Sequence, residues 1–291
     1  MKIDGNTRMA AVVAHPIRHS LSPLIHNLAF DLMDENAVYL AWDVKEKEFS
    51  SVIKNIQFLD MYGVNLSMPY KSLLLNKWDK LSDRVQLIGA ANTIVRKNGQ
   101  LIAHNTDGYG FFKSLLEEQN FNPKDKNITI LGAGAAAKAI IIEALFKEVK
   151  EISIFIRKSS SYSLVEAWLK NLVEKRETQV FLYDLDDYKN LQEKIYQSDL
   201  LIQATSVGMD GKSLVFPKNI SGHSHLLCVD LIYRWIESPF LLWARRQNLR
   251  AVNGLDMLIY QAAESFRLWT DKEMPLERIK REVEKEVYVK K

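Results

Sequence analysis

The chain of 291 residues contains one cysteine, Cys228, which excludes an internal disulfide and a cysteine metal cluster. A lone thiol fits the reducing cytoplasm. The net charge is only +3 and no long basic block is present, which argues against nucleic acid as a partner. The histidines have no metal-ligand spacing, so we expect no metal site; those considered are His15, His19, His26 and His104.

Long uninterrupted apolar runs are also missing. The first six residues contain no apolar signal core. The most apolar long stretch, residues 128–146, carries Lys138 and Glu143 and has glycines near its start, so it predicts a strand, a turn and a helix rather than a membrane span. We therefore expect a cytoplasmic protein with no membrane partner.

Alternating strand-like and helical segments fill the chain instead. Hydrophobic residues make up 47% and charged residues 26%, typical of a globular protein. The alternation predicts an α/β fold with mostly parallel sheets. Strands are expected at 9–14, 38–44, 63–66, 93–96, 101–104, 128–131, 151–156, 180–183, 200–204, 226–230 and 250–252, and helices at 23–33, 108–119, 135–146, 164–175, 257–270 and from 275 onward.

The length allows one large domain or two of ordinary size. We expect the chain to leave the first domain near Asp107 and to return to it near Gly254. The first domain would then comprise residues 1–107 and 254–291, and the second residues 108–253.

A dinucleotide-binding motif follows the strand at 128–131 and opens a helix. It has the form G-x-G-x-x-G/A and consists of Gly132, Ala133, Gly134, Ala135, Ala136 and Ala137. The first glycine permits a tight turn, the second lets a pyrophosphate approach the backbone, and the last alanine allows close helix packing. The helix N-terminus offers free N–H groups to the phosphates. A turn of small residues also arises from packing alone, but this context favours a cofactor.

The end of the next strand indicates which dinucleotide is bound. NAD recognition uses an acidic residue about 20 positions past the glycines. Here residue 156 is followed by Arg157, Lys158 and three serines, with no acid. A guanidinium suits the 2′-phosphate of NADP. The alternative is a solvated basic loop.

Lys71 and Asp107 lie in short polar motifs that follow apolar strand-like runs. The motifs span residues 63–71, 89–93 and 105–108. A lysine can donate a proton to a developing alkoxide, and a carboxylate can orient it. A nearby carboxylate raises a lysine pKa, whereas burial lowers it. The alternative is a surface ion pair worth about 0–1 kcal/mol.

These motifs, taken in order, resemble those of the shikimate/quinate dehydrogenase family over nearly the whole chain. They are His19-Ser20-Leu21-Ser22-Pro23, Asn65-Leu66-Ser67-Met68-Pro69-Tyr70-Lys71, Ala91-Asn92-Thr93, Asn105-Thr106-Asp107-Gly108, Gly132-Ala133-Gly134, Ala204-Thr205-Ser206-Val207-Gly208-Met209, Asp230-Leu231-Ile232-Tyr233, Gly254-Leu255-Asp256-Met257-Leu258 and Gln261-Ala262-Ala263.

The resemblance implies reversible, NADP-linked reduction of 3-dehydroshikimate to shikimate in aromatic amino-acid biosynthesis. It also implies an N-terminal α/β substrate domain, a Rossmann-type domain and a cleft between them. The implied substrate-binding residues are Ser20, Ser22, Asn65, Ser67, Lys71, Asn92, Asp107, Tyr233 and Gln261. Among these, Ser20 and Ser22 are implied to bind the substrate carboxylate. The implied cofactor-binding residues are Gly132, Ala133, Gly134, Ala135, Ala136, Arg157, Thr205, Leu231 and Gly254. Ser22, which precedes Pro23, is also expected to cap a helix.

Several positions depart from the family pattern, most of them on the cofactor side. Ala135 stands where glycine is usual, Ile156 and Lys158 replace Asn and Thr around the arginine, and Gln203 replaces Asn before Ala-Thr-Ser. Ser67 replaces a frequent Thr and keeps the hydroxyl. Two other functions stay open, an NAD-preferring quinate/shikimate dehydrogenase and a non-catalytic NADP sensor. The oligomeric state is expected to be a monomer or a homodimer.

Overall fold

The structure, a computed structural model, describes residues 3–18, 20–73, 75–173 and 177–289. His19, part of one predicted motif, therefore lies outside the described residues. The chain divides into two compact units, one of residues 1–113 with 258–291 and the other of residues 114–257. Both divisions fall inside helices, and each unit is described below by itself.

The first unit is built on a six-stranded mixed sheet with the order β2-β1-β3-β5-β6-β4. Its strands are β1 (Arg8–Ala14), β2 (Ala37–Asp43), β3 (Gly63–Leu66), β4 (Lys80–Leu81), β5 (Thr93–Lys97) and β6 (Gln100–His104). Strand β1 runs parallel to β2 and β3, whereas β5 is antiparallel to β3 and β6. Three of the five pairings in this sheet are parallel, in line with the prediction of mostly parallel pairing, and only the two pairings of β5 are antiparallel. Strands β5 and β6 form a hairpin whose turn residues, Asn98 and Gly99, both have positive φ, as a two-residue hairpin loop requires.

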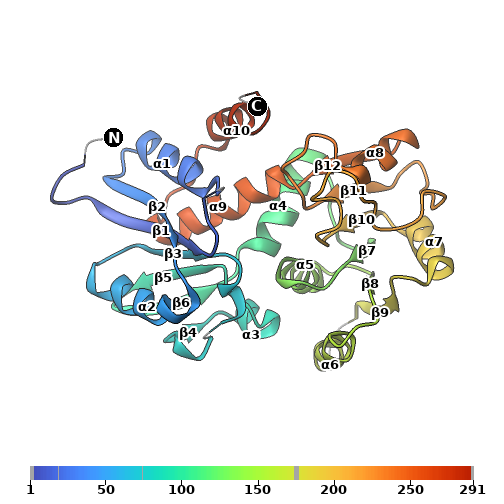
Figure 1. The fold of residues 1–291 in the computed structure, drawn as a ribbon, viewed down its shortest axis with the longest axis horizontal. Helices are drawn as coiled ribbons and strands as arrows, with labels where there is room; N and C mark the ends of the chain where they lie inside the picture. The colour runs from blue at the N-terminus through green and yellow to red at the C-terminus, as the bar shows by residue number, and fades with distance from the viewer. Residues whose placement is uncertain (1–2, 19, 74, 174–176, 290–291) are drawn as a thin grey trace. The chain divides into compact units, whose positions relative to one another are not determined.

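Helices of the first unit come from both ends of the sequence (Figure 1). They are α1 (Ser22–Leu32), α2 (Phe49–Phe58), α3 (Asp83–Ile88), α4 (Asp107–Gln119, which continues into the second unit), α9 (Leu255–Thr270, which begins there), α10 (Leu276–Glu284), the short 3-10 helices Glu46–Glu48, Tyr70–Ser72 and Leu75–Lys77, and the π-helical turn Lys285–Val289. The C-terminal helix α10 packs beside the N-terminal helix α1. The sequence pattern missed α2 and α3.

Alternate residues of β1 face opposite sides of the sheet, as strand geometry dictates. Ala11 and Val13 join a buried core with Phe49, Val52 and Ile56 of α2. The other face of the β1–β2 edge is covered by α1, whose buried residues include Ile25 and Phe30. Burial on both faces holds the ends of β1 and β3 in place.

The second unit contains an all-parallel sheet with the order β12-β11-β10-β7-β8-β9. Its strands are β7 (Asn127–Leu131), β8 (Glu151–Ile156), β9 (Gln179–Asp184), β10 (Leu200–Gln203), β11 (Leu227–Asp230) and β12 (Arg250–Asn253). The order reverses between β7 and β10, which makes this a doubly wound, Rossmann-type sheet. The predicted α/β fold class is confirmed.

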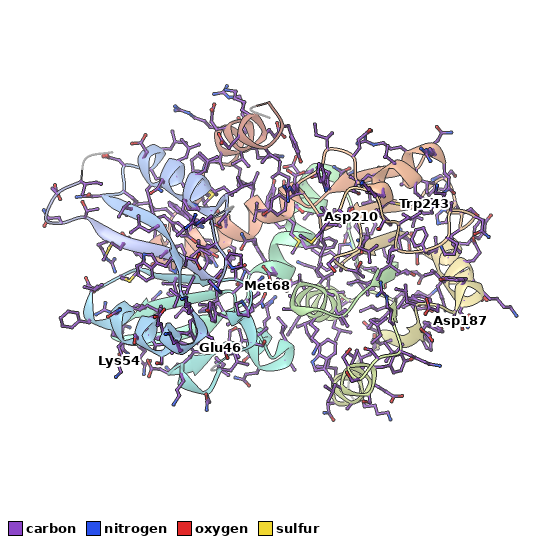
Figure 2. The ribbon with its side chains drawn as sticks, in the orientation of Figure 1. Glu46, Lys54, Met68, Asp187, Asp210 and Trp243 are labelled. Carbon is purple, nitrogen blue, oxygen red and sulfur yellow. The ribbon has the colours of Figure 1, made fainter. Side chains whose placement is uncertain are left out.

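Helices cover both faces of the second sheet (Figure 1). They are α5 (Ala135–Phe146), α6 (Tyr162–Val173), α7 (Tyr188–Gln197) and α8 (Pro239–Arg246). Helices α7 and α8 lie on one side and α5 on the other. The prediction missed α7 and α8, although each has an N-cap signal: Asp187 accepts from the Asn190 amide and Ser238 from the Leu241 amide. Figure 2 labels Asp187 at the start of α7 and Trp243 on α8. Within the described residues, no helix has the length and apolar character needed to cross a membrane.

Candidate active site

Lys71 and Asp107 form a close ion pair in the first unit. Lys71 lies in the 3-10 turn that follows β3, and Asp107 is the first residue of α4. The Lys71 Nζ atom is 2.6 Å from Oδ2 of Asp107. Asp107 is only 4% exposed, and the Lys71 side chain is 21% exposed. This is a partly desolvated pair rather than the exposed one that the alternative supposed.

Asn92 holds the other oxygen of the Asp107 carboxylate. Its Nδ2 atom donates to Oδ1 of Asp107 at 2.8 Å and to Oγ1 of Thr106 at 2.9 Å. Its Oδ1 atom accepts from the Thr106 backbone amide at 2.8 Å. Asn105 caps the same turn by accepting from the Asp107 amide at 3.0 Å. Each oxygen of the Asp107 carboxylate therefore has its own donor: Oδ1 accepts from Asn92 and Oδ2 from Lys71.

Gln261 reaches this network from α9. Its Oε1 atom lies 3.2 Å from Nδ2 of Asn92 and 3.4 Å from Oγ1 of Thr106. The approach requires Gly110 on α4, because a Cβ atom there would lie 2.4 Å from the backbone nitrogen of Gln261. The backbones of α4 and α9 are therefore in contact at Gly110. This contact lets the Gln261 side chain reach Asn92. Gly110 lies outside every predicted motif.

Asn65 lies directly opposite Thr93 in the β3–β5 pairing. The Asn65 Nδ2 atom donates toward Thr93 Oγ1 at 3.0 Å and toward Ser265 Oγ on α9 at 3.1 Å. Asn65 is 7% exposed, and Thr93 and Ser265 are fully buried. Thr93, Thr106 and Ser265 were not predicted. Thr93 and Thr106 lay inside quoted motifs, whereas Ser265, four residues after Gln261 on α9, had only helical spacing as a signal.

The two predicted carboxylate serines lie at the start of α1. The Ser22 amide donates to Oγ of Ser20 at 3.2 Å. The predicted N-cap role of Ser22 is wrong: Ser22 is the first residue of the helix, the cap position is Leu21, and no side chain caps it. Pro23 has no N–H group and the Ser22 amide bonds to Ser20, so these two positions of the first turn need no cap from Leu21.

Ser67 completes the predicted substrate set in the first unit. Its amide donates to the Val13 carbonyl at 2.9 Å, and its carbonyl accepts from the Tyr70 amide at 2.7 Å. The loop is thereby tied to the end of β1. The next residue, Met68 (labelled in Figure 2), is 77% exposed.

The glycine-rich turn of the second unit has the backbone that its motif predicts. Gly132 has φ +106°, and a Cβ atom there would lie 3.0 Å from the Ala204 carbonyl oxygen. A Cβ atom on Gly134, the N-cap of α5, would meet nothing within 4 Å. Ala133, Ala135 and Ala136 are partly exposed around this open N-terminus, whose amides have no partner within the helix. The turn therefore fits a diphosphate.

Gln203 builds the loop that carries Thr205. Its Oε1 atom accepts from the Thr205 amide at 2.7 Å and from the Thr205 hydroxyl at 2.8 Å, and its Nε2 atom donates to the Val207 carbonyl at 2.7 Å. Gln203 is fully buried. Glutamine at this position, where the family usually has asparagine, therefore still provides a carboxamide that closes the loop. Its side chain is longer by one methylene group.

Leu231 and Gly254 are neighbours, although 23 positions separate them in the sequence. A Cβ atom on Gly254 would lie 2.3 Å from the Leu231 carbonyl oxygen. Only glycine permits this approach of the loop after β12 to the loop after β11. Tyr233 is partly exposed, and burial raises the pKa of its hydroxyl.

Arg157 follows β8 directly and is exposed. It forms no ion pair with any residue that the structure describes. Lys158, in contrast, lies 3.9 Å from Asp184 at the end of the neighbouring strand β9. The guanidinium is therefore the group available to an anionic ligand, as NADP recognition needs.

The predicted residues thus fall into two groups. Ser20, Ser22, Asn65, Ser67, Lys71, Asn92, Asp107 and Gln261 lie in the first unit, whereas Gly132, Ala133, Gly134, Ala135, Ala136, Arg157, Thr205, Leu231, Tyr233 and Gly254 lie in the second. A cluster of His, Cys, Asp or Glu side chains able to hold a metal ion is absent from the described part of the chain.

Two family models match the chain. Residues 12–94 match the shikimate dehydrogenase substrate binding domain, and residues 254–284 match the shikimate 5′-dehydrogenase C-terminal domain. The first match contains Asn65, Lys71 and Asn92, and the second contains Gln261.

Similar proteins cover the chain from end to end. A shikimate dehydrogenase (NADP(+)) of Lactococcus lactis subsp. cremoris is 52% identical over 99% of this chain and 100% of its own length. One of Streptococcus pneumoniae is 50% identical over 96% of this chain and 97% of its own length. The crystal structure of shikimate 5-dehydrogenase from Listeria monocytogenes, in complex with shikimate and NAD, matches with a TM-score of 0.92 and 37% identity, covering 97% of this chain and 98% of that one.

Proposed function

The chain belongs to the shikimate dehydrogenase family, and we propose that it catalyses the reversible NADP-linked reduction of 3-dehydroshikimate to shikimate, a step of aromatic amino-acid biosynthesis. The observation that carries the proposal is the 2.6 Å pair of Lys71 and Asp107, joined to Asn92 and Gln261 by hydrogen bonds. We propose that the first unit binds the substrate and that the second binds the cofactor.

We propose Lys71 as the proton donor to the oxygen of the reduced carbonyl. Its ammonium stabilises the developing negative charge and donates a proton to it. Asp107 orients Lys71 through Oδ2, and Asn92 fixes the carboxylate through Oδ1. In the oxidative direction the same nitrogen takes the proton back.

The remaining polar residues of the first unit are proposed to orient the ring. Ser20 and Ser22 at the start of α1 suit the carboxylate, because hydroxyl groups donate to it. Asn65, Ser67, Asn92 and Gln261 offer amide and hydroxyl groups to the ring hydroxyls, and Tyr233 of the second unit is proposed to approach the substrate as well. A site built to hydrogen-bond hydroxyl groups rejects ligands that lack them.

The residues of the second unit are proposed to hold NADP. The cofactor, when bound, supplies the hydride. Gly132, Gly134 and the α5 N-terminus suit the diphosphate, and Arg157 suits the 2′-phosphate because it has no ion-pair partner among the described residues. Ala133, Ala135, Ala136, Thr205, Leu231 and Gly254 complete the proposed set.

One alternative keeps a specific observation in its favour. The related Listeria protein was crystallised with NAD, so an NAD-preferring quinate/shikimate dehydrogenase remains the second candidate. A non-catalytic sensor is disfavoured, because ligand sensing alone does not need Lys71 and Asp107 paired. The free buried thiol of Cys228 supports the proposed cytoplasmic location, and the oligomeric state we propose is a monomer or a homodimer.

The test is a four-way rate comparison. Purified protein is mixed with shikimate or quinate and with NADP or NAD, and reduced-cofactor absorbance is followed at substrate concentrations up to about 1 mM, the upper range of common KM values. We expect the highest kcat/KM with shikimate and NADP. Faster turnover with NAD would select the second candidate, and no turnover with any pair would reject the enzyme.

A further inference from the structure

Tyr39 is a buried tyrosine on the edge strand β2, and no sequence motif contains it. Its side chain is 1% exposed, and its hydroxyl donates to Oδ1 of Asn65 at 2.6 Å. The hydroxyl thus contacts the oxygen end of one of the proposed substrate-binding carboxamides.

The partners of Asn65 determine which way its carboxamide faces. The backbone oxygen of Asn92 can only accept, and it lies 3.1 Å from Nδ2 of Asn65. The amide nitrogen therefore faces Asn92, and the oxygen faces the Tyr39 hydroxyl. A flipped amide would bring two oxygens together at Asn92.

This orientation also decides what Asn65 can offer to a ligand. Its two amide hydrogens already have three acceptors within 3.1 Å, the Asn92 carbonyl and the hydroxyls of Thr93 and Ser265. No donor is left over. The free capacity of Asn65 is the second lone pair of Oδ1, so it can only accept a hydrogen bond from a substrate hydroxyl.

Helix α1 holds Tyr39 through both its backbone and its ring. The Asn27 side chain bonds both backbone groups of Tyr39, accepting from its amide at 2.8 Å and donating to its carbonyl at 2.9 Å. These groups lie on the side of β2 that has no strand neighbour. The ring of His26 stacks on the ring of Tyr39 at 4.3 Å with an interplanar angle of 10°.

The same helix connects Tyr39 with a proposed carboxylate residue. Ser22 lies one turn before His26, so both side chains face Tyr39. Burial raises the pKa of the Tyr39 hydroxyl well above its usual value, and the nearby Ser22 side chain lowers that pKa by a smaller amount. The hydroxyl is therefore a permanent donor at physiological pH.

We propose that Tyr39 is a positioning residue for substrate binding: its hydroxyl holds the Asn65 carboxamide with a lone pair of Oδ1 directed for a substrate hydroxyl, and it ties Asn65 to the α1 helix that carries Ser22. The inference rests on the proposed function and adds to it the residue that orients the ring-hydroxyl acceptor. Tyr39 acts through Asn65 and is not itself a catalytic residue.

Tyr39→Phe is the direct test, because phenylalanine keeps the ring and its stacking on His26 and removes only the hydroxyl. We expect the KM for shikimate to rise about tenfold, as loss of one oriented hydrogen bond predicts. The KM for NADP and the pH dependence of kcat should stay unchanged. Tyr62→Phe is the matched control, because its hydroxyl bonds Glu35 at 3.1 Å in the same unit and lies outside the network.

A double-mutant cycle shows whether Tyr39 acts through Asn65. Shikimate dissociation constants are measured by calorimetry for Tyr39→Phe, Asn65→Ala and the double variant. If Tyr39 works through Asn65, its hydroxyl should matter less than twofold once Asn65 is alanine. Independent, additive effects would overturn the proposal, as would a Tyr39→Phe enzyme with wild-type KM.

Two further measurements separate the possible failures. Wild-type turnover of shikimate is read first, so that a failure of the proposed function is distinguished from a failure of the Tyr39 role. If circular dichroism shows that Tyr39→Phe does not fold, Ser265→Ala removes an acceptor from the other end of the Asn65 carboxamide. A raised shikimate KM for Ser265→Ala then supports the orienting network, and a wild-type KM overturns it.

Discussion

The ammonium of Lys71 lies 2.6 Å from Oδ2 of Asp107, while Oδ1 of the same carboxylate accepts from Asn92 at 2.8 Å. One carboxylate thus joins the proposed proton donor to an amide network that extends through Asn92 to Gln261. Lys71 and Asn92 bond different oxygens of the Asp107 carboxylate, so loss of either one leaves an oxygen of that carboxylate without its hydrogen-bond donor.

Replacement of Lys71 by alanine should leave the fold intact and lower kcat by about 10²–10⁴-fold, the range for loss of a general acid–base group. The KM for NADP should change little, because Lys71 belongs to the first unit. Steady-state kinetics and circular dichroism check this. Lys80→Ala, an exposed lysine of the same unit, is the control. A Lys71→Ala enzyme within threefold of wild type would rule out the proposed role.

Arg157→Ala should remove most of the preference for NADP over NAD. We expect wild type to prefer NADP by at least about tenfold in kcat/KM, equivalent to ~1.4 kcal/mol. The variant should raise the KM for NADP and leave NAD use almost unchanged, because NAD offers no phosphate to the guanidinium. Lys158→Ala is the control, since Lys158 lies near Asp184 and should have a smaller effect. Equal use of both cofactors by wild type would contradict the assignment.

Gln203→Leu should weaken NADP binding without affecting shikimate. The substitution keeps the side-chain volume but removes the carboxamide that bonds Thr205 and Val207, leaving buried polar groups unpaired at a cost of about 1–3 kcal/mol. The NADP KM should rise at least about fivefold, as measured by cofactor titration. The NADP KM of Gln203→Asn should lie between those of wild type and Gln203→Leu, because asparagine retains the carboxamide on a shorter side chain. An unchanged NADP KM in Gln203→Leu would show that the Thr205 loop does not contribute to cofactor binding.

His26 should make the protein less stable in acid. Burial lowers the pKa of its imidazole to about 3, whereas a histidine in the unfolded chain titrates near 6.5. Between these values the unfolded state binds one more proton, so this contribution to stability is present above about pH 6.5 and is lost as pH falls toward 3. The slope is about 1.4 kcal/mol per pH unit for a single proton.

His26→Phe tests this, because it keeps a flat ring against Tyr39 and removes the titration. Urea unfolding of both proteins at pH 7, 6, 5 and 4.5 gives the comparison. The free energy of unfolding of wild type relative to the variant should fall as the pH is lowered. A difference that stays constant across this range would show that His26 does not carry the acid sensitivity.

Local sequence patterns were enough to predict several elements residue by residue. Helix α5 and strand β8 have the predicted bounds, because a glycine turn precedes the first and the apolar run of the second ends at Arg157 and Lys158. The alternation of strand-like and helical segments indicated the α/β class, whereas the Rossmann-type second domain was implied by the family resemblance. Helices α2 and α7 were missed because each has only 10 residues and few buried apolar positions, which are Phe49, Val52 and Ile56 in α2 and Leu191 and Ile195 in α7.

Motifs in the sequence predicted which residues form the candidate site, since Lys71, Asp107, Asn92 and the glycine turn lie in short, recognisable runs. Only the tertiary structure decided how these residues are held. Ser265 and Gln261 meet Asn65 and Asn92 across sequence separations of 200 and 169 residues, and Tyr39 reaches Asn65 from the edge of the sheet. Such contacts depend on strand register and on the close approach of α4 and α9 at Gly110, and no local pattern encodes either. A hydrogen bond needs its donor and acceptor about 2.7–3.2 Å apart, and packing of the whole unit sets that distance.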